Sequence, residues 1–494
     1  MRPGPGALVW AGFDGPEVPG ALLDAIRDGR VGGLLLFAFR GNISGKEQVR
    51  AMLREAQAAA ARGGLPPVPV AVDQEGGTVV RIAYRAVFPS AMAIGATGDP
   101  QYAERAAGAV GEGLLADGIG VDHAPVCDVN ADARNPVIGT RSFGDDPVRV
   151  ADFAAAWVRG SEGVGVATTP KHFPGHGATE VDSHHTTVDV KADRGTLDAR
   201  ELVPFRAAFA AGASGAMTAH VRYPALDPEN IATLSPRILV DLLRTELGFT
   251  GLAMTDSLDM SGVTLVATPD ELVGRAVRAG IDAVMVTSGL ERQLAAAEAI
   301  STQVPAPRVL EALRRAAAFR ERFGLPVPDG DVDDRPARSL AAEIAAASIT
   351  ANATPPAHLR EIRVAYLPPA VASPVEELRD PAALFEAALR RRFGVRLTFA
   401  VGTAPEGDAP LIVCTSSASF DRAQADRARA LLAGAALHCA MRSPYDVALQ
   451  PQPVPTLLTY GDVPASLDAL AAVLAGEREP AGRAPVSLPG FPRA

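Results

Sequence analysis

Residues 165–187 read GVATTPKHFPGHGATEVDSHHTT, a stretch that combines a signal for the fold with a signal for chemistry. Its first residues are small or β-branched, which predicts a short buried strand that runs up to Lys171 and His172. Pro174 and the glycines after it prevent the chain from continuing as a strand or a helix. We therefore expect a strand that presents Lys171 and His172 at its C-terminal end, followed by a long loop.

The same order of strand and loop recurs along the first 325 residues. Short, continuous apolar runs alternate with amphipathic stretches, which predicts parallel strands covered by helices. Eight such units in this length favour a closed (β/α)8 TIM-type barrel over an open doubly wound sheet. The predicted strands are 7–13, 32–37, 67–73, 120–126, 165–172, 213–221, 251–256 and 281–288. The predicted helices are 18–29, 46–62, 100–118, 147–163, 195–212, 235–247, 269–280 and 290–323.

Polar side chains recur where these predicted strands end. In a barrel all the loops that follow the strands open on one face, and that face carries the active site. The polar residues at or just after strand ends are Asp73, Arg81, Asp128, Asn130, Arg141, Lys171, His172, His220 and Asp256. No G-x-G-x-x-G motif opens a helix after the first strand, which argues against a dinucleotide site.

Four of the chain's eight histidines lie in the stretch quoted above, beside one of its three lysines. Three interpretations are open. Asp182 and His184 can form an acid–base dyad, in which the carboxylate orients the imidazole and raises its proton affinity. His172 and His176 have the i, i+4 spacing of zinc ligands, but that spacing suits a helix, which the intervening proline excludes. In the third interpretation the histidines are hydrated surface residues, which their density beside Lys and Asp makes the minority view.

Asp256 is a carboxylate expected at the same mouth of the barrel. Asp is a common helix cap, but Asp259 suits that role at least as well, which leaves Asp256 for chemistry. Beside the cationic Lys171 and Arg141, Asp256 should stay ionised, as a nucleophile must. Displacement at an acetal carbon needs such a carboxylate on one face and a proton donor to the leaving oxygen on the other. A histidine paired with Asp182 can supply that proton near neutral pH.

Composition narrows the classes of protein. The net charge of −10 argues against a nucleic-acid partner, because phosphate binding needs a basic face. The three cysteines stand in apolar surroundings and suggest no disulfide framework. No apolar run approaches membrane-spanning length, and the N-terminus lacks the apolar core of a signal peptide. We therefore expect a cytoplasmic protein that does not bind a membrane.

Residues 326–345 are expected to link a catalytic domain at 1–325 to a second domain at 346–494. The linker begins with a run rich in Pro, Asp and Gly. Strands are predicted at 361–367, 396–401, 410–415, 435–441 and 456–460, with helices at 339–348, 381–392, 420–433 and 464–475. The second domain is thus also α/β and of ordinary size. It has no comparable cluster of His, Lys and carboxylates, so we expect it to support structure or interaction.

With these motifs in view, the chain resembles a family 3 glycoside hydrolase of the β-N-acetylglucosaminidase branch. The resemblance covers nearly the whole chain, and its most specific parts are KHFPGHG at 171–177 and DSH at 182–184. Other matching segments are DQEGG at 73–77, APVCDVN at 124–130, NPVIGTRSFG at 135–144, MTAH at 217–220, TDSL at 255–258, RSPYD at 442–446 and APVSLPG at 484–490.

The resemblance implies a barrel followed by a smaller α/β sandwich domain. It also implies a retaining, exo-acting enzyme that releases terminal β-linked N-acetylglucosamine, from peptidoglycan-derived or related glycosides, without a metal or cofactor. Asp256 would be the nucleophile and His184, oriented by Asp182, the general acid/base. The residues that would bind the terminal sugar are Asp73, Arg81, Arg141, Lys171 and His172. The partner would be a small carbohydrate, and a monomer is the expected state.

Two positions depart from the family pattern. Ala178 stands where Asp or Asn is usual, and His185 follows DSH where apolar residues are usual. One alternative is a β-N-acetylglucosaminide phosphorylase, because a histidine lacks the negative charge that would repel incoming phosphate. β-Glucosidase-type activity on the same scaffold is another. An alternative of a different class is a non-catalytic sugar-binding or regulatory protein.

Overall fold

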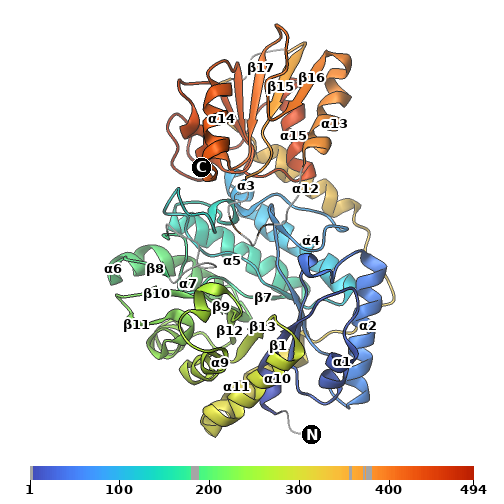
Figure 1. Ribbon diagram of the computed structural model, residues 1–494, viewed down its shortest axis with the longest axis vertical. Coiled ribbons are helices and arrows are strands. Elements are labelled where there is room, and N and C mark those ends of the chain that lie inside the picture. Colours follow the sequence, from blue (N-terminus) through green and yellow to red (C-terminus); the bar gives the residue numbers. More distant parts are fainter. Residues whose placement is uncertain (1–3, 180–187, 355–358, 371–372, 374–375, 377–380) are drawn as a thin grey trace.

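The computed structural model describes residues 4–179, 188–354, 359–370, 373, 376 and 381–494. The chain forms two lobes, a larger one coloured blue to yellow and a smaller one coloured orange to red (Figure 1). Each lobe is built on a sheet whose strands are mainly parallel. Within the described residues, no helix combines the length and the apolar character needed to cross a membrane.

The larger lobe is a nearly closed eight-stranded parallel barrel, which confirms the predicted fold class. Its strands follow the order β7-β6-β3-β2-β1-β13-β12-β9. Hydrogen bonds from Met217 N to Pro170 O (3.1 Å) and from Phe173 N to Met217 O (2.8 Å) join its two ends. Each predicted strand overlaps one of β1 (Val9–Gly12), β2 (Gly33–Leu35), β3 (Val70–Val72), β6 (Val121–Asp122), β7 (Ala167–Thr168), β9 (Gly215–Thr218), β12 (Leu252–Ser257) and β13 (Ala283–Val286).

Helices cover the outside of this barrel in the positions that the amphipathic pattern predicts. They are α1 (Gly20–Arg27), α2 (Lys46–Arg62), α4 (Gln101–Asp117), α5 (Pro147–Val164), α7 (Leu202–Ala210), α9 (Pro269–Ala279), α10 (Leu290–Gln303) and α11 (Ala306–Phe323). Two further segments, Leu197–Glu201 and Arg237–Glu246, are π-helical. Short helices are α3 (Ala91–Ala96), α6 (Arg194–Thr196) and α8 (Ser261–Thr264).

Local sequence sets the ends of these helices, as α5 illustrates. The Asp146 side chain accepts hydrogen bonds from the backbone N–H groups of Val148 and Arg149, and Pro147 occupies the first turn. At the other end, Gly165 has φ +99°, a left-handed conformation that stops the helix without strain. The helix therefore ends directly before β7, which leads to Lys171 and His172.

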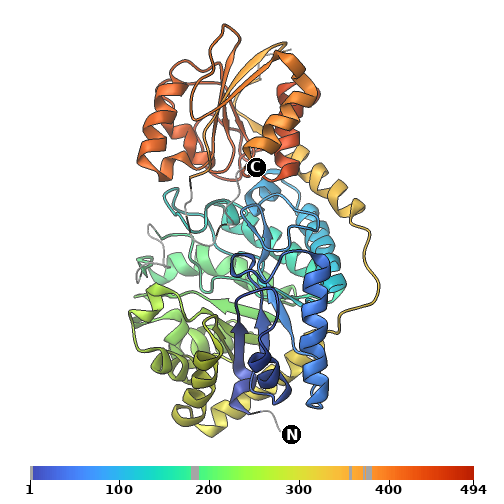
Figure 2. The ribbon, with the colours of Figure 1, turned by 45° about the vertical axis from the view of Figure 1, so that its right-hand side comes forward.

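Apolar side chains fill the barrel interior below the level of the strand ends. They form a cluster of Trp10, Leu35, Ala71, Val121, Ala167, Met217, Leu252, Met254, Ala283, Met285, Phe319 and Phe323. The last two belong to α11, and the ring of Phe319 meets Trp10 edge-on with centroids 6.1 Å apart. α11 thus plugs the end of the barrel that lies away from the smaller lobe (Figures 1 and 2).

Two small sheets were not predicted. The hairpin β4 (Gln74–Gly76) and β5 (Val79–Val80) directly follows β3. A second sheet joins β8 (Val188–Asp189), β10 (Val221–Tyr223) and β11 (Asp227–Ile231). The predicted strand 213–221 therefore covers two observed strands, all of β9 in the barrel and the first residue of β10. Both additions lie next to strand C-terminal ends, where barrel loops carry extra structure.

The smaller lobe has a six-stranded sheet with helices on both faces. Its strands are β14 (Thr350–Ala351), β15 (Ile362–Tyr366), β16 (Leu397–Val401), β17 (Leu411–Thr415), β18 (Leu437–Ala440) and β19 (Thr456–Leu458), in the order β14-β19-β18-β17-β15-β16, with β14 antiparallel. Helices α13 (Ala382–Phe393) and α15 (Pro464–Leu474) share one core, and α14 (Arg422–Leu432) packs in another. This is the expected α/β sandwich.

A helix, α12 (Arg335–Ser348), occupies most of the predicted linker and starts before the predicted helix at 339–348. The exact boundaries of the two domains stay a prediction. The lobes share a small apolar core, in which α3 packs against the 458–460 and 484–491 segments. Polar contacts across the junction are Ser90 Oγ to Tyr460 O (2.6 Å) and Asn130 Nδ2 to the hydroxyl of Tyr445 (2.7 Å). The smaller lobe thus holds the loop that begins beside Asp128.

Candidate active site

One layer of side chains lies at the C-terminal end of the barrel interior. Side chains alternate along a strand, so the residue two positions after an interior residue also points inward. The interior cluster contains Ala71, Val121, Ala167 and Met254, one residue from each of four strands. The residues two positions further on are Asp73, His123, Thr169 and Asp256. Asp73 therefore belongs to this layer. A register shift between Met254 and Ser257 interrupts the alternation in β12, but Asp256 lies close enough to His123 to raise the pKa of that imidazole.

The ammonium group of Lys171 forms ion pairs with two carboxylates of the site. Its Nζ lies 2.6 Å from Asp73 Oδ1 and 2.6 Å from Glu75 Oε1. The lysine side chain is fully buried. Burial lowers the pKa of Lys171, but Asp73 and Glu75 outweigh this effect and hold the pKa above its usual value. Lys171 is therefore a charged group fixed between two carboxylates, those of Asp73 and Glu75.

Arg141 adds a second cation to the same cluster. Its Nε and Nη2 donate to the two oxygens of Glu75 at 2.8 and 2.9 Å, a bidentate pair with both side chains buried. Burial raises the pKa of Glu75, but Arg141 and Lys171 outweigh this and lower it to about 2. Burial also raises the pKa of Asp73, and Lys171 and Arg81 bring it well below its usual range. Both carboxylates are ionised at neutral pH.

Glu75 reaches the cluster because of the β4–β5 hairpin. Gly76 has φ +90°, and a Cβ at this position would lie 2.6 Å from Pro89 O, so the tight turn requires glycine. The side chain of Gln74 accepts from the backbone N–H groups of Arg81 and Ile82 and ties the hairpin together. Arg81 lies at the far side of this hairpin, with Nη2 4.0 Å from Asp73 Oδ2.

Asp128 fixes the orientation of His172. Its Oδ2 lies 2.7 Å from His172 Nδ1, and its two oxygens also accept from the backbone N–H groups of His172 and His176. Burial raises the pKa of Asp128, but His172 outweighs this and lowers it. The other ring nitrogen of His172 faces Arg141, with Nε2 3.4 Å from Nη2. The structure therefore brings together four predicted sugar-binding residues, namely Asp73, Arg141, Lys171 and His172, and places Arg81 beside Asp73.

Asp256 ends β12 on the other side of the barrel. Its Oδ1 accepts from Ser257 N at 2.6 Å, and the side chain is partly exposed. Asp259 caps no helix, contrary to expectation. Its carboxylate accepts from the backbone N–H groups of Thr287 (2.6 Å) and Ser288 (2.8 Å) and thus joins this loop to the loop after β13. His220 Nε2 lies 3.0 Å from Ser257 O and supports the same segment.

The predicted acid–base residues Asp182 and His184, like His185, lie outside the described residues. The structure describes the segment that leads to them. Asn135 donates to His176 O (2.9 Å), and the hydroxyl of Thr179 lies 2.9 Å from His176 Nδ1. A Cβ at Gly177 would lie 1.7 Å from Val129 O, so glycine is required where these two loops touch. The hydrogen bonds of His176 with Asn135 and Thr179 therefore form even though position 178 is Ala and not the usual Asp or Asn.

The sequence does not single out Glu75 or His123, and it does not reveal the role of Asp128. Glu75 stands in the DQEGG segment, where its nearness to Asp73 was a signal, but its partners depend on the hairpin. Asp128 was noted at a strand end without its role in holding His172. His123 lies in the interior layer, and only the register of β6 shows this. Among the described residues, no group of three or more His, Cys, Asp or Glu side chains is arranged to hold a metal ion.

Glu75→Gln should lower the free energy of unfolding strongly at neutral pH and weakly in acid. The pKa of Glu75 is about 2 in the folded protein, against 4.5 for an ordinary glutamate. The unfolded chain binds more protons between these values, so the stabilisation is present above pH 4.5 and is lost as the pH falls toward 2. Urea unfolding at pH 7 should show a loss of about 3 kcal/mol, which shrinks at pH 3.

A suitable control for Glu75→Gln is Glu343→Gln. Glu343 pairs with Arg105 at 3.0 Å, but both side chains are about half exposed. Exposed pairs are screened by water and contribute little. We expect Glu343→Gln to change stability slightly at each pH, whereas a pH-independent loss for Glu75→Gln would contradict the assigned ion pairs.

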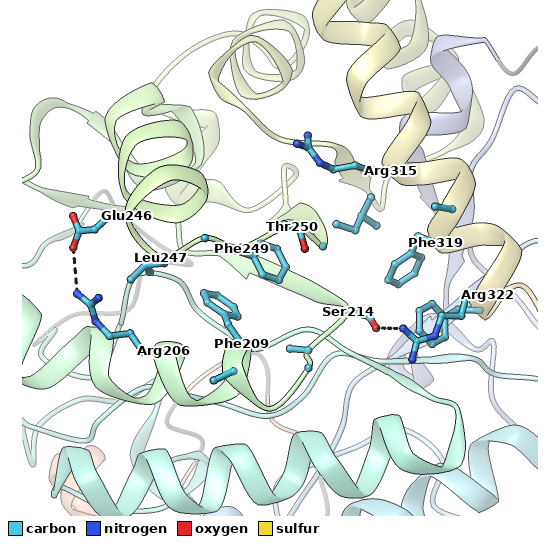
Figure 3. Close-up of a pocket in the computed structure, with 18 residues that line it drawn as sticks. Arg206, Phe209, Ser214, Glu246, Leu247, Phe249, Thr250, Arg315, Phe319 and Arg322 are labelled. Atoms are coloured by element: carbon cyan, nitrogen blue, oxygen red, sulfur yellow. Dashed lines mark hydrogen bonds and ion pairs between the residues drawn. The ribbon is translucent and has the colours of Figure 1, made fainter.

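A pocket of about 710 Å³ lies at the end of the barrel opposite the candidate active site (Figure 3). It is bounded by the segments before β9 and β12 and by α11. At its side the rings of Phe209 and Phe249 pack at a tilt, with centroids 4.5 Å apart. Its arginines have partners: Arg206 pairs with Glu246 and Arg322 donates to Ser214 Oγ. This pocket contains none of the residues at the C-terminal strand ends.

Comparisons with known proteins identify similar sequences and structures. Residues 18–318 match the glycosyl hydrolase family 3 N terminal domain. The chain is 34% identical over 367 residues to a beta-hexosaminidase A of Pseudoalteromonas piscicida, an alignment that covers 67% of this chain and 61% of that protein. It is 39% identical over 291 residues to a beta-hexosaminidase of Stenotrophomonas maltophilia, covering 56% of this chain and 83% of that protein.

A solved structure matches both lobes. It is that of a glycoside hydrolase family 3 beta-N-acetylglucosaminidase from Paenibacillus sp. str. FPU-7, which is 33% identical, has a TM-score of 0.90 and covers 99% of each chain. A beta-glucoside phosphorylase, BglX, shares the fold at 21% identity with a TM-score of 0.83. The family match spans more than half of the chain and falls on the barrel that carries the charged cluster. The chain belongs to glycosyl hydrolase family 3.

Proposed function

We propose that this protein is a retaining, exo-acting glycoside hydrolase that releases terminal β-linked N-acetylglucosamine. The observation that carries the proposal is the layer at the C-terminal strand ends, which combines a fixed polar cluster with a separate carboxylate. β3, which precedes Asp73, and β12, which carries Asp256, lie four strands apart in the barrel order. Family membership and the likeness to a beta-N-acetylglucosaminidase over both lobes support the same activity.

The charged cluster would bind the terminal sugar. Asp73, Arg81, Arg141, Lys171 and His172 offer fixed charged donors and acceptors, and vicinal hydroxyl groups can bond to both kinds. Ion pairs hold Asp73 and Lys171 in place before the sugar arrives, so little ordering is needed on binding. A terminal sugar enclosed in this way leaves room for chain extension only at its anomeric oxygen, which would make the enzyme exo-acting.

Asp256 would act as the nucleophile, with His184 as general acid/base oriented by Asp182. In the first step a carboxylate oxygen of Asp256 bonds to C1, the bond between C1 and the leaving oxygen breaks, and His184 gives its proton to that oxygen. In the second step water attacks C1, His184 takes its proton, and the bond to Asp256 breaks. Two inversions at C1 retain the β configuration, and the scheme uses no cofactor.

The natural substrate would be a small, soluble glycoside derived from peptidoglycan or a related polymer. The sequence motifs that support this are KHFPGHG and DSH, which mark the branch of the family that acts on N-acetylglucosaminides. A β-linked N-acetylglucosamine at the non-reducing end is the common element of such fragments. Localisation in the cytoplasm would suit the recycling of these fragments.

A panel of 4-nitrophenyl β-glycosides tests the proposal. We expect the N-acetylglucosaminide to be cleaved with a kcat/KM well above those of the glucoside and the xyloside, with or without inorganic phosphate. Faster cleavage of the glucoside would contradict the assigned specificity. A strict requirement for phosphate, with N-acetylglucosamine 1-phosphate as product, would make the protein a phosphorylase. Binding without any turnover would make it a sugar-binding protein.

A further inference from the structure

His123 is a buried histidine in the layer that forms the floor of the site. It follows β6, and its backbone N–H donates to Val72 O at 2.8 Å, so it sits next to the strand end that leads to Asp73. Its Nδ1 lies 3.0 Å from the hydroxyl of Thr169, another member of the layer. The residue is 3% exposed. Both its position and one of its two nitrogens are therefore fixed by the barrel.

The other ring nitrogen of His123, Nε2, has no hydrogen-bonding partner within the part of the chain that the structure describes. Buried polar atoms normally have partners, and one that lacks them is costly. Other buried histidines follow that rule: His220 bonds to Thr233 and Ser257 O, and His438 bonds to Thr415 and Gln450. His123 thus differs from them because its Nε2 can still form a hydrogen bond.

The surroundings of His123 make it a neutral group among charged ones. Burial lowers its pKa to about 4, while Asp73 and Asp256 partly oppose this and Lys171 reinforces it. The imidazole is therefore uncharged at neutral pH. A neutral ring whose Nδ1 faces the Thr169 hydroxyl can donate or accept at Nε2, and a sugar hydroxyl can serve as the partner in either case.

We propose that Nε2 of His123 hydrogen-bonds a hydroxyl group of the bound terminal sugar. In the barrel order β6 is next to β3 and three strands from β12. The contact therefore falls on the side of the sugar ring held by Asp73, away from the anomeric carbon near Asp256. This inference rests on the proposed function, and it makes His123 a substrate-contact residue that selects for one non-anomeric hydroxyl.

The test combines a variant with substrate analogues. His123→Phe keeps a ring of similar shape and removes both ring nitrogens, and it is assayed with 4-nitrophenyl N-acetylglucosaminide and its 3-, 4- and 6-deoxy analogues. In the wild type, each missing hydroxyl that has a partner should lower kcat/KM about tenfold or more. In His123→Phe, the penalty for one hydroxyl should vanish while the other two persist. Three unchanged penalties would overturn the proposal.

His438→Phe is the matched control. It is the same change at a buried histidine of the smaller lobe whose two nitrogens are bonded inside the protein. It should leave all three deoxy penalties at their wild-type values, because a general loss of packing acts alike on every substrate. Selective loss of one penalty in this variant would show that such a loss does not indicate a direct contact between the histidine and the sugar.

Two outcomes separate this inference from the proposed function. If the wild type cleaves no N-acetylglucosaminide, the proposed function fails. The comparison of wild type and His123→Phe is then repeated with deoxy analogues of the glycoside that the wild type does cleave. If His123→Phe does not fold, a crystal structure of the wild type with N-acetylglucosamine decides. Nε2 should then lie within about 3.2 Å of a sugar hydroxyl oxygen, and a separation beyond about 3.5 Å from every hydroxyl would overturn the inference.

Discussion

Asp256→Ala is expected to lower kcat/KM for 4-nitrophenyl β-N-acetylglucosaminide by about 10⁴-fold or more. The variant has no carboxylate to bond to C1, and the charged cluster around Lys171 contains no substitute, because Asp73 and Glu75 are held in ion pairs. The methyl side chain leaves the fold intact, since Asp256 ends its strand partly exposed. Initial rates of nitrophenol release by wild type and variant measure the effect.

Azide makes this prediction specific for a nucleophile. A small anion can enter the space left by the carboxylate and attack C1 from the same face, which yields the α-glycosyl azide. Rescue of Asp256→Ala by azide is therefore expected. Asp259→Ala is the matched control: its carboxylate holds Thr287 and Ser288, so it should lower stability and gain nothing from azide. Retention of near wild-type activity by Asp256→Ala would refute the assigned nucleophile.

Lys171→Met is expected to be the most damaging single change to the fold of the site. The side chains are similar in length, but the variant leaves Asp73 and Glu75 close together without the cation between them. Removing one partner from a buried ion pair costs about 3–5 kcal/mol, and we expect a loss of that size in the free energy of unfolding. Urea unfolding at pH 7 measures this loss.

The same variant should bind sugar poorly, because Asp73 is no longer fixed and a charged donor is absent. Lys46→Met is the matched control. Lys46 also pairs with a carboxylate, Asp331, at 2.7 Å, but on the surface, where such pairs contribute little. Its stability and kinetics should stay close to wild type. Equal stability losses for the two lysine variants would contradict the account of the buried cluster.

The barrel could be predicted because its strands are short, buried on both faces and separated by amphipathic helices. Each of the eight predicted strands overlaps an observed one, and Asp73 and Asp256 come at strand ends where the topology exposes them. The motif residues Lys171 and His172 likewise lie where the strand pattern places them. Patterns of this kind depend on residues close together in the chain, which is why a single sequence reveals them.

The partners within the site could not be predicted, because they depend on loops. Glu75 meets Lys171 and Arg141 only because a glycine-dependent hairpin folds it back over β3. Asp259 was expected to cap a helix, but it binds a loop 28 residues further along the chain. Such contacts join segments far apart in sequence, and their geometry has no local signal. His123 also needed the strand register, since a shift by one residue would turn its side chain outward.

The proposed mechanism depends on a covalent bond between Asp256 and the anomeric carbon of the sugar. Its most direct test is to incubate the wild type with a 5-fluoro-N-acetylglucosaminyl fluoride, whose glycosyl-enzyme intermediate breaks down slowly, and to map the adduct by mass spectrometry of peptides. We expect one added sugar on the peptide that contains Asp256, and none in Asp256→Ala. A sugar bonded to a different residue would contradict it.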